Sequence, residues 1–464
     1  MDTLLKIINT SSDFVWNVLL IWVLVFTGLY FTIRLGIPQF TRLTVSFKHA
    51  FGGIFKKKDK KSGKEGISSF QALATAVAAQ IGTGNIGGVA TAIVSGGPGA
   101  VFWMWVSGIL GMSTIFAEAV LAQKFKQKDT DGTTYGGPSY YLSQGLPNKA
   151  IGRTLAVIFS LLIIIALGFC GNMVQSNSIG LAMKTFHVPP IVTGVVIAII
   201  AALIFIGGIK RIAKFAEMVV PFMAVLYLIA SVAILGIYWN RIIEVFAMIF
   251  EAAFTGKAVL GGIAGASVKM AMRYGLARGL FSNEAGMGST PHAHAVAAVD
   301  HPVQQGYAAM AGVVVDTLLV CTATALIILL TGAREQFTDL NSVELTAKAF
   351  HLAFGNFGEM FLSIALLFFS FTTVIGWYYF GESNIRYLFK SQAAALWAYR
   401  LIVVACIIIG ATLKVELVWS LSDFFNGLMV LPNAIGILWL SPLVVQAKKE
   451  YETLTPTQQY SDVE

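Results

Sequence analysis

The chain has 464 residues, of which 56% are hydrophobic and only 12% are charged, and its mean hydropathy is +0.74. A soluble globular protein of this length would be far less apolar, so we expect an all-α protein that crosses a membrane several times. The formal net charge of +8 does not indicate a nucleic-acid partner, because the basic residues cluster in short segments beside apolar stretches, where they orient membrane helices.

About eleven apolar stretches are long enough to cross a hydrocarbon core of ~30 Å. They are expected near residues 14–36, 68–94, 97–125, 152–184, 189–209, 213–238, 264–298, 303–331, 357–387, 394–412 and 417–446. The first stretch lacks the small-residue cleavage site of a signal peptide, so we expect it to remain as a membrane helix.

Lysine and arginine residues fall in the loops that a single alternating topology would place in the cytoplasm. These clusters are Lys48, Lys56, Lys57, Lys58, Lys60, Lys61 and Lys64; Lys124, Lys126 and Lys128; Lys210, Arg211 and Lys214; Arg386 and Lys390; and Lys448 and Lys449. The positive-inside rule therefore predicts a multi-pass protein of the cell (inner) membrane, with the N-terminus outside and the C-terminus in the cytoplasm.

Glycine-rich segments interrupt two of the expected helices, at residues 80–88 (QIGTGNIGG) and 281–288 (FSNEAGMG). When the first helix is set aside, ten remain, and an interrupted helix opens each half of five. Because the halves begin on opposite sides of the membrane, they predict a five-plus-five inverted repeat with a site near the midplane. The expected divisions are an N-terminal helix with a basic loop (1–66), a first repeat (67–240), an extracellular amphipathic segment (241–263), a second repeat (264–448) and a cytoplasmic tail (449–464).

The first interruption is expected to be a binding site. Unwound backbone at membrane depth is tolerated only where it lines a cavity or holds a ligand. Its glycines match the spacing of a dinucleotide fingerprint, but no strand precedes them and no acidic residue follows at the required distance. Close helix packing through Gly84 and Gly88 is another interpretation. It leaves Gln80, Thr83 and Asn85 unexplained.

The second interruption contains Glu284, and a carboxylate at membrane depth predicts a functional site. It could pair with a substrate ammonium group, a cation or a proton. The alternative is a structural ion pair with Arg278, Arg273 or Lys269. Asp316 also lies within a span, and for Glu118 we favour a structural role as a capping or gate partner.

The pair His292 and His294 suggests a metal site together with Glu284. Residues two apart on a helix point to different faces, so this spacing is poor for one metal ion. A further motif, residues 371–377 (FTTVIGW), places Thr373 and Trp377 on one helix face. The threonine hydroxyls could bind an alkali cation, or they could bond back to their own helix carbonyls.

Three motifs resemble the alanine or glycine:cation symporter family, also called sodium:alanine symporters: residues 81–92 (IGTGNIGGVATA), 96–105 (GGPGAVFWMW) and 281–289 (FSNEAGMGS). The resemblance covers nearly the whole chain, and only the lysine-rich loop and the tail after Lys449 look unconstrained. The family belongs to the amino acid–polyamine–organocation superfamily. The resemblance therefore implies the leucine transporter fold, preceded here by one extra N-terminal helix.

The resemblance also implies roles for particular residues. Backbone amides of Thr83 and Gly84 would hold a substrate carboxylate, and bulky side chains would limit the substrate to alanine or glycine. The implied substrate-binding residues are Gln80, Gly82, Thr83, Gly84, Asn85, Phe281, Ser282, Asn283, Glu284, Gly286, Met287, Thr373 and Trp377. The implied sodium ligands are the carbonyls of Ala78, Ile81 and Phe369 and the hydroxyls of Thr372 and Thr373. Asn85 and Ser282 match ligands of the fold's other sodium site, but Gln80 and Glu284 do not obviously complete it.

The sequence thus predicts sodium-coupled symport of alanine or glycine by alternating access, in a protein that works as a monomer in the lipid bilayer and performs no chemistry on its substrate. One alternative is a proton-coupled amino acid symporter with Glu284 as the proton carrier. Another is an intramembrane hydrolase that uses His292, His294 and Glu284, but the sequence offers no third well-spaced ligand or nucleophile.

Overall fold

The computed structural model describes residues 11–12, 14–52, 66–129, 132–255, 268–413 and 415–461. Most of the expected basic loop lies outside these residues. The described part is almost entirely helical, with one two-stranded hairpin of β1 (Gln127–Lys128) and β2 (Thr134–Tyr135).

Seven described helical spans are long and apolar enough to cross a membrane. They are α7 (Ala100–Lys124), Lys149–Phe186, α12 (Gly208–Ile237), Pro302–Thr331, α20 (Asn356–Phe389), α21 (Ala393–Gly410) and Val418–Trp439 within α22 (Val415–Trp439). The span Lys149–Phe186 consists of α9 (Lys149–Ile163), η3 (Ile164–Gly171), α10 (Asn172–Met183) and η4 (Lys184–Phe186), and Pro302–Thr331 consists of α16 (Pro302–Val313), η6 (Val314–Cys321) and α17 (Thr322–Thr331). An eighth is the bent pair of α5 (Ser69–Gln80) and Gly84–Gly96 (η2 and α6), whose two parts meet at 51°.

Shorter helices occupy the other expected spans. These are α2 (Ile21–Arg34), preceded by η1 (Val15–Leu20), α11 (Pro190–Phe205), and the pair α14 (Val268–Asn283) and α15 (Pro291–Ala295). Length and composition therefore qualify eight of the eleven expected spans as membrane-crossing, within the described residues.

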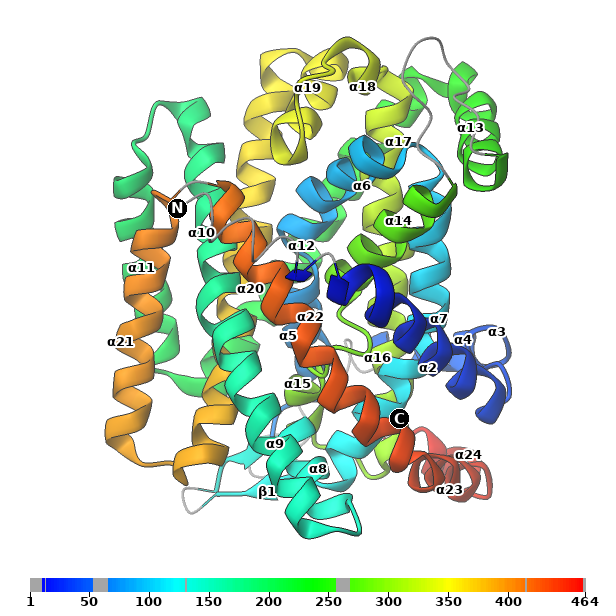
Figure 1. Cartoon of the computed structure of the whole chain (residues 1–464), viewed down its shortest axis with the longest axis vertical. Coiled ribbons are helices and arrows are strands. Elements are labelled where there is room, and N and C mark those ends of the chain that lie inside the picture. Colours follow the sequence, from blue (N-terminus) through cyan, green and yellow to red (C-terminus); the bar gives the residue numbers. More distant parts are fainter. Residues whose placement is uncertain are drawn as a thin grey trace.

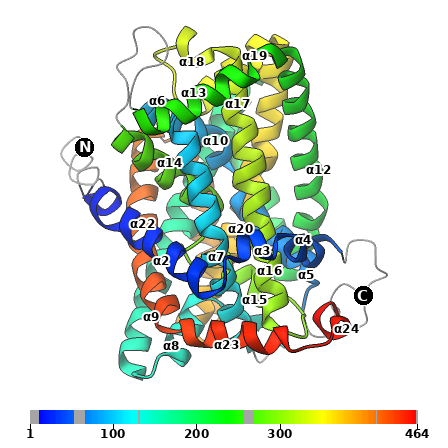
Figure 2. The same cartoon turned by 90° about the vertical axis from the view of Figure 1, so that its right-hand side faces the viewer.

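Further short helices lie at the two ends of the molecule. One end carries α13 (Ile242–Thr255), α18 (Ala333–Gln336) and α19 (Ser342–Phe354), and the opposite end carries β1, α8 (Pro138–Gly145) and α23 (Ser441–Glu452) (Figures 1 and 2). The remaining short helices are α3 (Pro38–Thr41), α4 (Leu43–Phe51), η5 (Trp239–Arg241) and α24 (Pro456–Gln459).

The long helices pack in two sets. Helix α7 packs most extensively against α14 and α16, and we call these three the α7 group. Helix α20 packs against α9 and α10, and α21 packs against α10 and α11, so we call these five the α20 group. The first broken helix contacts both sets, because α5 packs against α16 and against α20. Its break therefore lies where the two groups meet.

Both breaks have a local physical cause. Helix α5 begins at a capping box between Ser68 and Gln71 and ends at Gln80, after which Ile81 adopts an extended conformation with ψ 94°. In the second break the backbone φ is positive at Glu284 (57°), Gly286 (91°) and Gly288 (78°). Glycine accepts this conformation without strain, whereas a non-glycine residue such as Glu284 persists in it only where its surroundings hold it.

The predicted interruption at 281–288 is present, and one sequence-based boundary was wrong. As the interruption predicted, the expected span 264–298 is two helices separated by the second break. The expected span 417–446 instead ends at Trp439, after which α23 runs across the end of the molecule (Figure 2). The tail that looked unconstrained is packed: the Tyr451 hydroxyl lies 2.9 Å from Nε2 of His49, and Nζ of Lys48 lies 3.4 Å from the ring centre of Tyr460. Aromatic residues thus fix the tail against α4.

Candidate functional site

A cluster of oxygen atoms surrounds the hydroxyl of Thr373 in α20. Its Oγ1 lies 3.1 Å from the carbonyl oxygen of Ala78, 3.2 Å from that of Ile81 and 3.0 Å from that of Phe369. One hydroxyl carries one proton, so it can donate to only one of these three acceptors at a time. The cluster is therefore rich in unshared electron pairs, and it joins the end of α5 to α20.

Thr372 lies at the edge of this cluster. Its hydroxyl donates to the same Phe369 carbonyl at 2.9 Å and lies 3.7 Å from the sulfur of Met223. The structure thus brings Ala78, Ile81 and Phe369 directly around Thr373, whereas Thr372 reaches them only through the Phe369 carbonyl.

The first break is held by side chains from two other helices. The peptide N–H and the hydroxyl of Thr83 both donate to Oε1 of Gln175 in α10, at 3.2 and 2.6 Å. The Thr83 hydroxyl also lies 3.0 Å from that of Ser370 in α20. Within the break, the N–H of Gly82 donates to Oδ1 of Asn85 at 2.8 Å.

Sequence reasoning missed Gln175 and Ser370. A signal for Gln175 exists, because Asn172, Gln175, Ser176, Asn177 and Ser178 form a polar run inside an apolar span. Only the folded structure shows that Gln175 is the member of this run that meets the break.

Hydrogen bonds also join the two breaks to each other. Nε2 of Gln80 donates to the carbonyl of Asn283 at 2.6 Å, while its Oε1 is buried without a hydrogen-bond partner. Oδ1 of Asp316 in η6 (Val314–Cys321) accepts from Nδ2 of Asn85 at 2.6 Å and from the hydroxyl of Ser282 at 3.0 Å. Asp316 was noted in the sequence without a partner, and the fold places it between the two breaks.

Glu284 is fully buried and bonds to neutral groups. Its Oε1 accepts from the indole N–H of Trp377 at 2.5 Å, and its Oε2 accepts from the hydroxyl of Ser289 at 2.5 Å. The alternative that Glu284 pairs with Arg278 is wrong, because Arg278 binds both carboxylate oxygens of Asp423 in α22, at 3.0 and 2.8 Å. Within the described part of the chain, Glu284 makes no ion pair with lysine or arginine.

Two aromatic rings meet beside the breaks. Phe281 and Trp377 meet edge to face, with ring centres 6.3 Å apart. A Cβ atom at Gly84 would lie 3.2 Å from the Phe281 ring, and one at Gly171 would lie 2.7 Å from the Trp377 ring. The absence of side chains at these glycines is therefore what lets the rings approach. Met287 is also buried, and its N–H donates to the Glu284 carbonyl at 3.1 Å.

Glu118 is a cap for the second break, as favoured from the sequence. Its two carboxylate oxygens accept from the N–H groups of Gly286 at 3.0 Å and Gly288 at 2.9 Å, and Oε1 also accepts from Nδ2 of Asn433 at 2.6 Å. The carboxylate thereby satisfies backbone donors that the broken helix leaves free.

The two histidines bind different parts of the protein. Nδ1 of His292 lies 2.7 Å from the carbonyl of Ser289, and its Nε2 lies 2.8 Å from Nδ2 of Asn384. Nδ1 of His294 lies 2.7 Å from Nε2 of Gln305 in α16. Among the residues that the structure describes, no cluster of three or more histidine, cysteine, aspartate or glutamate side chains could hold a metal ion.

A cavity of about 240 Å³ lies beside the Arg278–Asp423 ion pair, and Phe281 and Trp16 also line it. Phe281 thus separates this cavity from Gly84 in the first break.

Comparisons with known proteins identify a family. The model of the sodium:alanine symporter family matches residues 1–463. "Sodium/alanine symporter AgcS" of Methanococcus maripaludis is 43% identical over 452 residues, which are 97% of each chain. "Probable sodium/glutamine symporter GlnT" of Bacillus subtilis is 42% identical over 448 residues, covering 96% of this chain and 90% of that one.

Among solved structures, MhsT in complex with L-phenylalanine superimposes with a TM-score of 0.55 at 12% identity, covering 83% of this chain and 99% of that one. The predicted all-α transporter fold is therefore confirmed. With a family match along almost its entire length, this multi-pass membrane protein is a transporter, not an enzyme, and it belongs to the sodium:alanine symporter family.

Proposed function

We propose that the protein is a secondary active transporter that moves alanine or glycine into the cell together with sodium, by alternating access. The observation that carries this proposal is the oxygen cluster around Thr373. Carbonyl and hydroxyl oxygens are hard ligands suited to a cation such as sodium. The carbonyls of Ala78 and Ile81 also come from the C-terminal end of α5, where the helix dipole is negative.

A sodium ion in this cluster would join α5 to α20, across the boundary between the two helix groups. An ion that binds one arrangement of the groups more tightly than another shifts the protein toward that arrangement. Sodium would thus favour the outward-facing state that receives the amino acid, and its gradient would drive uptake.

The amino acid would bind beside the cation, at the first break. The N–H groups of Thr83 and Gly84 lie at the N-terminal, positive end of the following half-helix and would bind the substrate carboxylate. In this structure the Thr83 N–H donates to Oε1 of Gln175. A substrate carboxylate could replace Gln175 as the acceptor of this N–H. Phe281 and Trp377 would limit the substrate side chain to a methyl group or a hydrogen atom.

We infer that the end carrying β1, α8 and α23 is cytoplasmic. Lys128 lies in β1 and Lys448 and Lys449 lie in α23, and these elements lie at the same end of the molecule (Figure 1). The N-terminus would then be outside a cell (inner) membrane.

The direct test is uptake of radiolabelled alanine into proteoliposomes under an inward sodium gradient, with potassium in place of sodium as the control. We expect uptake only with sodium, competition by glycine, and weak competition by glutamine. Equal uptake with potassium would overturn sodium coupling, and strong competition by glutamine would overturn the limit on substrate size.

A second candidate is proton-coupled uptake with Glu284 as the carrier. The observation that favours it is the burial of this carboxylate among neutral donors, because an isolated buried charge is costly and protonation removes it. Alanine uptake driven by an inward pH gradient without sodium would support this candidate, and its absence would exclude it.

A further inference from the structure

A continuous chain of hydrogen bonds leaves α20 at Trp377, passes through the second break and returns to α20 at Asn384. Trp377 donates to Oε1 of Glu284 and Ser289 donates to Oε2 of Glu284, each at 2.5 Å. His292 then bonds to the Ser289 carbonyl at 2.7 Å, and Asn384 bonds to His292 at 2.8 Å. Trp377 and Asn384 are seven residues apart on the helix, so they lie on the same face two turns from each other.

The geometry defines the direction of each bond at the histidine. The Ser289 carbonyl can only accept, so Nδ1 of His292 carries the proton. Nε2 is then an acceptor and receives an N–H of the Asn384 amide. This hydrogen bond connects α15, which packs mainly against α7 and α5, to α20.

Asn384 is held firmly on the α20 side. Its other N–H donates to the Phe380 carbonyl at 2.8 Å, and its Oδ1 accepts from the hydroxyls of Ser139 in α8 and Ser160 in α9. Every hydrogen-bonding position of the amide is therefore filled, and His292 is its partner from α15.

The ring of His292 is inserted among residues of α20 and its neighbours. It stacks on Phe159 of α9, with ring centres 6.2 Å apart, and on Phe380 of α20, at 5.6 Å. A Cβ atom at Gly137, just before α8, would lie 2.6 Å from the ring. The side chain thus fills a gap between the helix groups on the α8 and α23 side of the substrate site.

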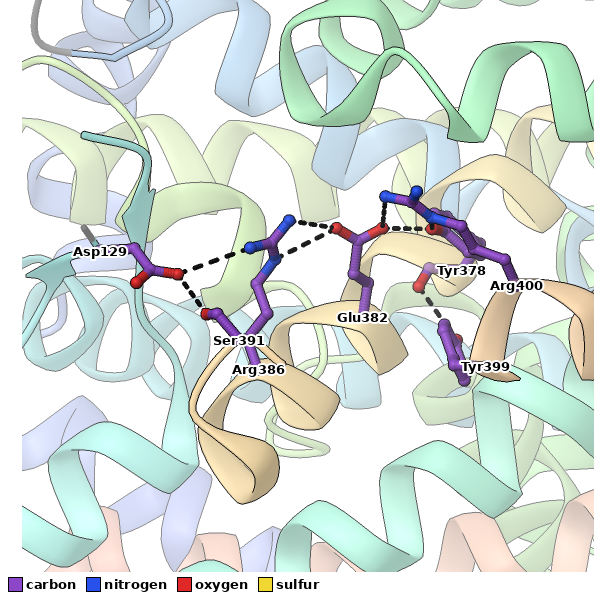
Figure 3. A network of polar contacts seen from close by, with 7 residues as sticks. All are labelled: Asp129, Tyr378, Glu382, Arg386, Ser391, Tyr399 and Arg400. Carbon is purple, nitrogen blue, oxygen red and sulfur yellow. Dashed lines mark hydrogen bonds and ion pairs between the residues drawn. The ribbon is translucent and has the colours of Figure 1, made fainter. Parts of the chain in front are cut away.

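The α20 side of this junction is also braced by charge. Figure 3 shows Glu382 in α20 between Arg386, at 2.9 Å, and Arg400 of α21, at 3.7 Å, with Asp129 beside Arg386 at 3.5 Å. Opposite charges alternate along this network, so α20 and α21 are fixed to each other close to Asn384. The hydrogen bond between Asn384 and His292 lies outside this charged network.

We propose that His292 is a positioning residue that closes the cytoplasmic side of the site through Asn384, and that Trp377 and Glu284 couple this closure to the substrate pocket. The proposal rests on the alternating access proposed above. Release to the cytoplasm requires the His292 ring to leave Phe159 and Phe380 and its bond to Asn384 to break.

The test uses accessibility, measured in the full chain. Thr290 precedes α15, is buried and has a hydroxyl without a hydrogen-bond partner, so Thr290→Cys removes no bond. The native cysteines Cys170, Cys321 and Cys406 are first replaced by alanine or serine. An impermeant maleimide is then added from the cytoplasmic side, and the rate at which it labels the cysteine introduced by Thr290→Cys is compared with and without His292→Phe. Phenylalanine keeps a ring between Phe159 and Phe380 but loses both bonds, and we expect labelling to become about tenfold faster.

The matched control is His294→Phe, because His294 is as deeply buried in the same short helix but bonds to Gln305 of the α7 group. We expect no comparable rise with this variant. Equal acceleration by both variants would show that α15 has simply loosened, and an unchanged rate with His292→Phe would show that the junction does not close the site. Either result would overturn the proposal.

Coupling is tested with Trp377→Phe, which keeps a ring but removes the N–H donor to Glu284. If this chain of hydrogen bonds couples the pocket to the junction, the double variant Trp377→Phe/His292→Phe should increase the labelling rate by less than the product of the two single-variant increases. Independent effects would overturn the coupling. Labelling needs no transported substrate, so these results remain distinguishable from a failure of sodium-driven alanine uptake.

Discussion

The indole N–H of Trp377 donates to Oε1 of Glu284 at 2.5 Å, and this bond fixes the second break to the helix that also carries Thr373. The proposed cation cluster and the proposed pocket wall therefore share one helix, α20. A change of side chain at Trp377 is expected to alter which substrates fit, whereas a change at Thr373 is expected to alter ion binding.

Trp377→Ala should admit larger amino acids, because it removes a wall of the space beside Gly84 and leaves a cavity. Competition of leucine and glutamine with labelled alanine measures this effect. Trp377→Phe is the matched control, and it should keep the size limit while alanine affinity falls about fivefold to tenfold through loss of the bond to Glu284. An unchanged substrate profile in Trp377→Ala would show that Trp377 does not line the substrate pocket.

Thr373→Ala should raise the sodium concentration for half-maximal uptake by about tenfold, while alanine affinity at saturating sodium changes about twofold or less. The reason is that its hydroxyl lies among three carbonyl oxygens. Thr372→Ala should have the smaller effect, since Thr372 touches only the Phe369 carbonyl of that cluster. Equal losses of sodium and alanine affinity in Thr373→Ala would argue against the cation site.

Gly82→Ala should weaken both sodium and alanine binding, because the added methyl group would lie 2.4 Å from Oγ1 of Thr373. Overpacking of this kind costs about 1–3 kcal/mol, so we expect a loss of affinity of about tenfold to a hundredfold at a site that must shift to accept it. Gly88→Ala is the control, since nothing lies within 4 Å of the corresponding position. The two variants are compared by sodium titration of uptake and by thermal stability of the purified protein.

Glu284→Gln distinguishes sodium coupling from proton coupling. Glutamine can still accept from the Trp377 N–H, but it cannot carry a transported proton. If sodium is the coupling ion, sodium-driven uptake should persist, reduced by about tenfold or less through weaker hydrogen bonding at the break. Complete loss of uptake in a correctly folded variant would instead favour Glu284 as the proton carrier.

Several features of the site could be predicted from local sequence alone. The glycines at 82 and 288 mark unwound backbone, because an apolar span with such a segment cannot continue as a regular helix. Thr373 and Trp377 share a face of α20 because they are four residues apart. The role of Glu118 as a cap was also favoured, since a carboxylate in a span must find donors.

The contacts between distant segments were not predictable in this way. Gln175 and Thr83 are hydrogen-bonded although they are 92 residues apart in the chain, and Asn85 and Asp316 are hydrogen-bonded although they are 231 residues apart. Polar residues inside a span indicate that some partner exists, but the rotation and tilt of each helix determine which partner it is. The alternative pairing of Glu284 with Arg278 was wrong for this reason, because helix packing brings Asp423 to Arg278 and Trp377 to Glu284.

The sequence by itself determined the class of protein, the approximate positions of its membrane helices, the two breaks and the residues that line them. These depend on hydropathy and backbone freedom, which are properties of short segments. Only the tertiary structure decided that the carbonyls at the end of α5 face Thr373, that Gln175 reaches Thr83 and that His292 closes a chain of bonds back to α20. Each of these contacts joins helices far apart in the chain, so it exists only when the α7 and α20 groups pack against each other.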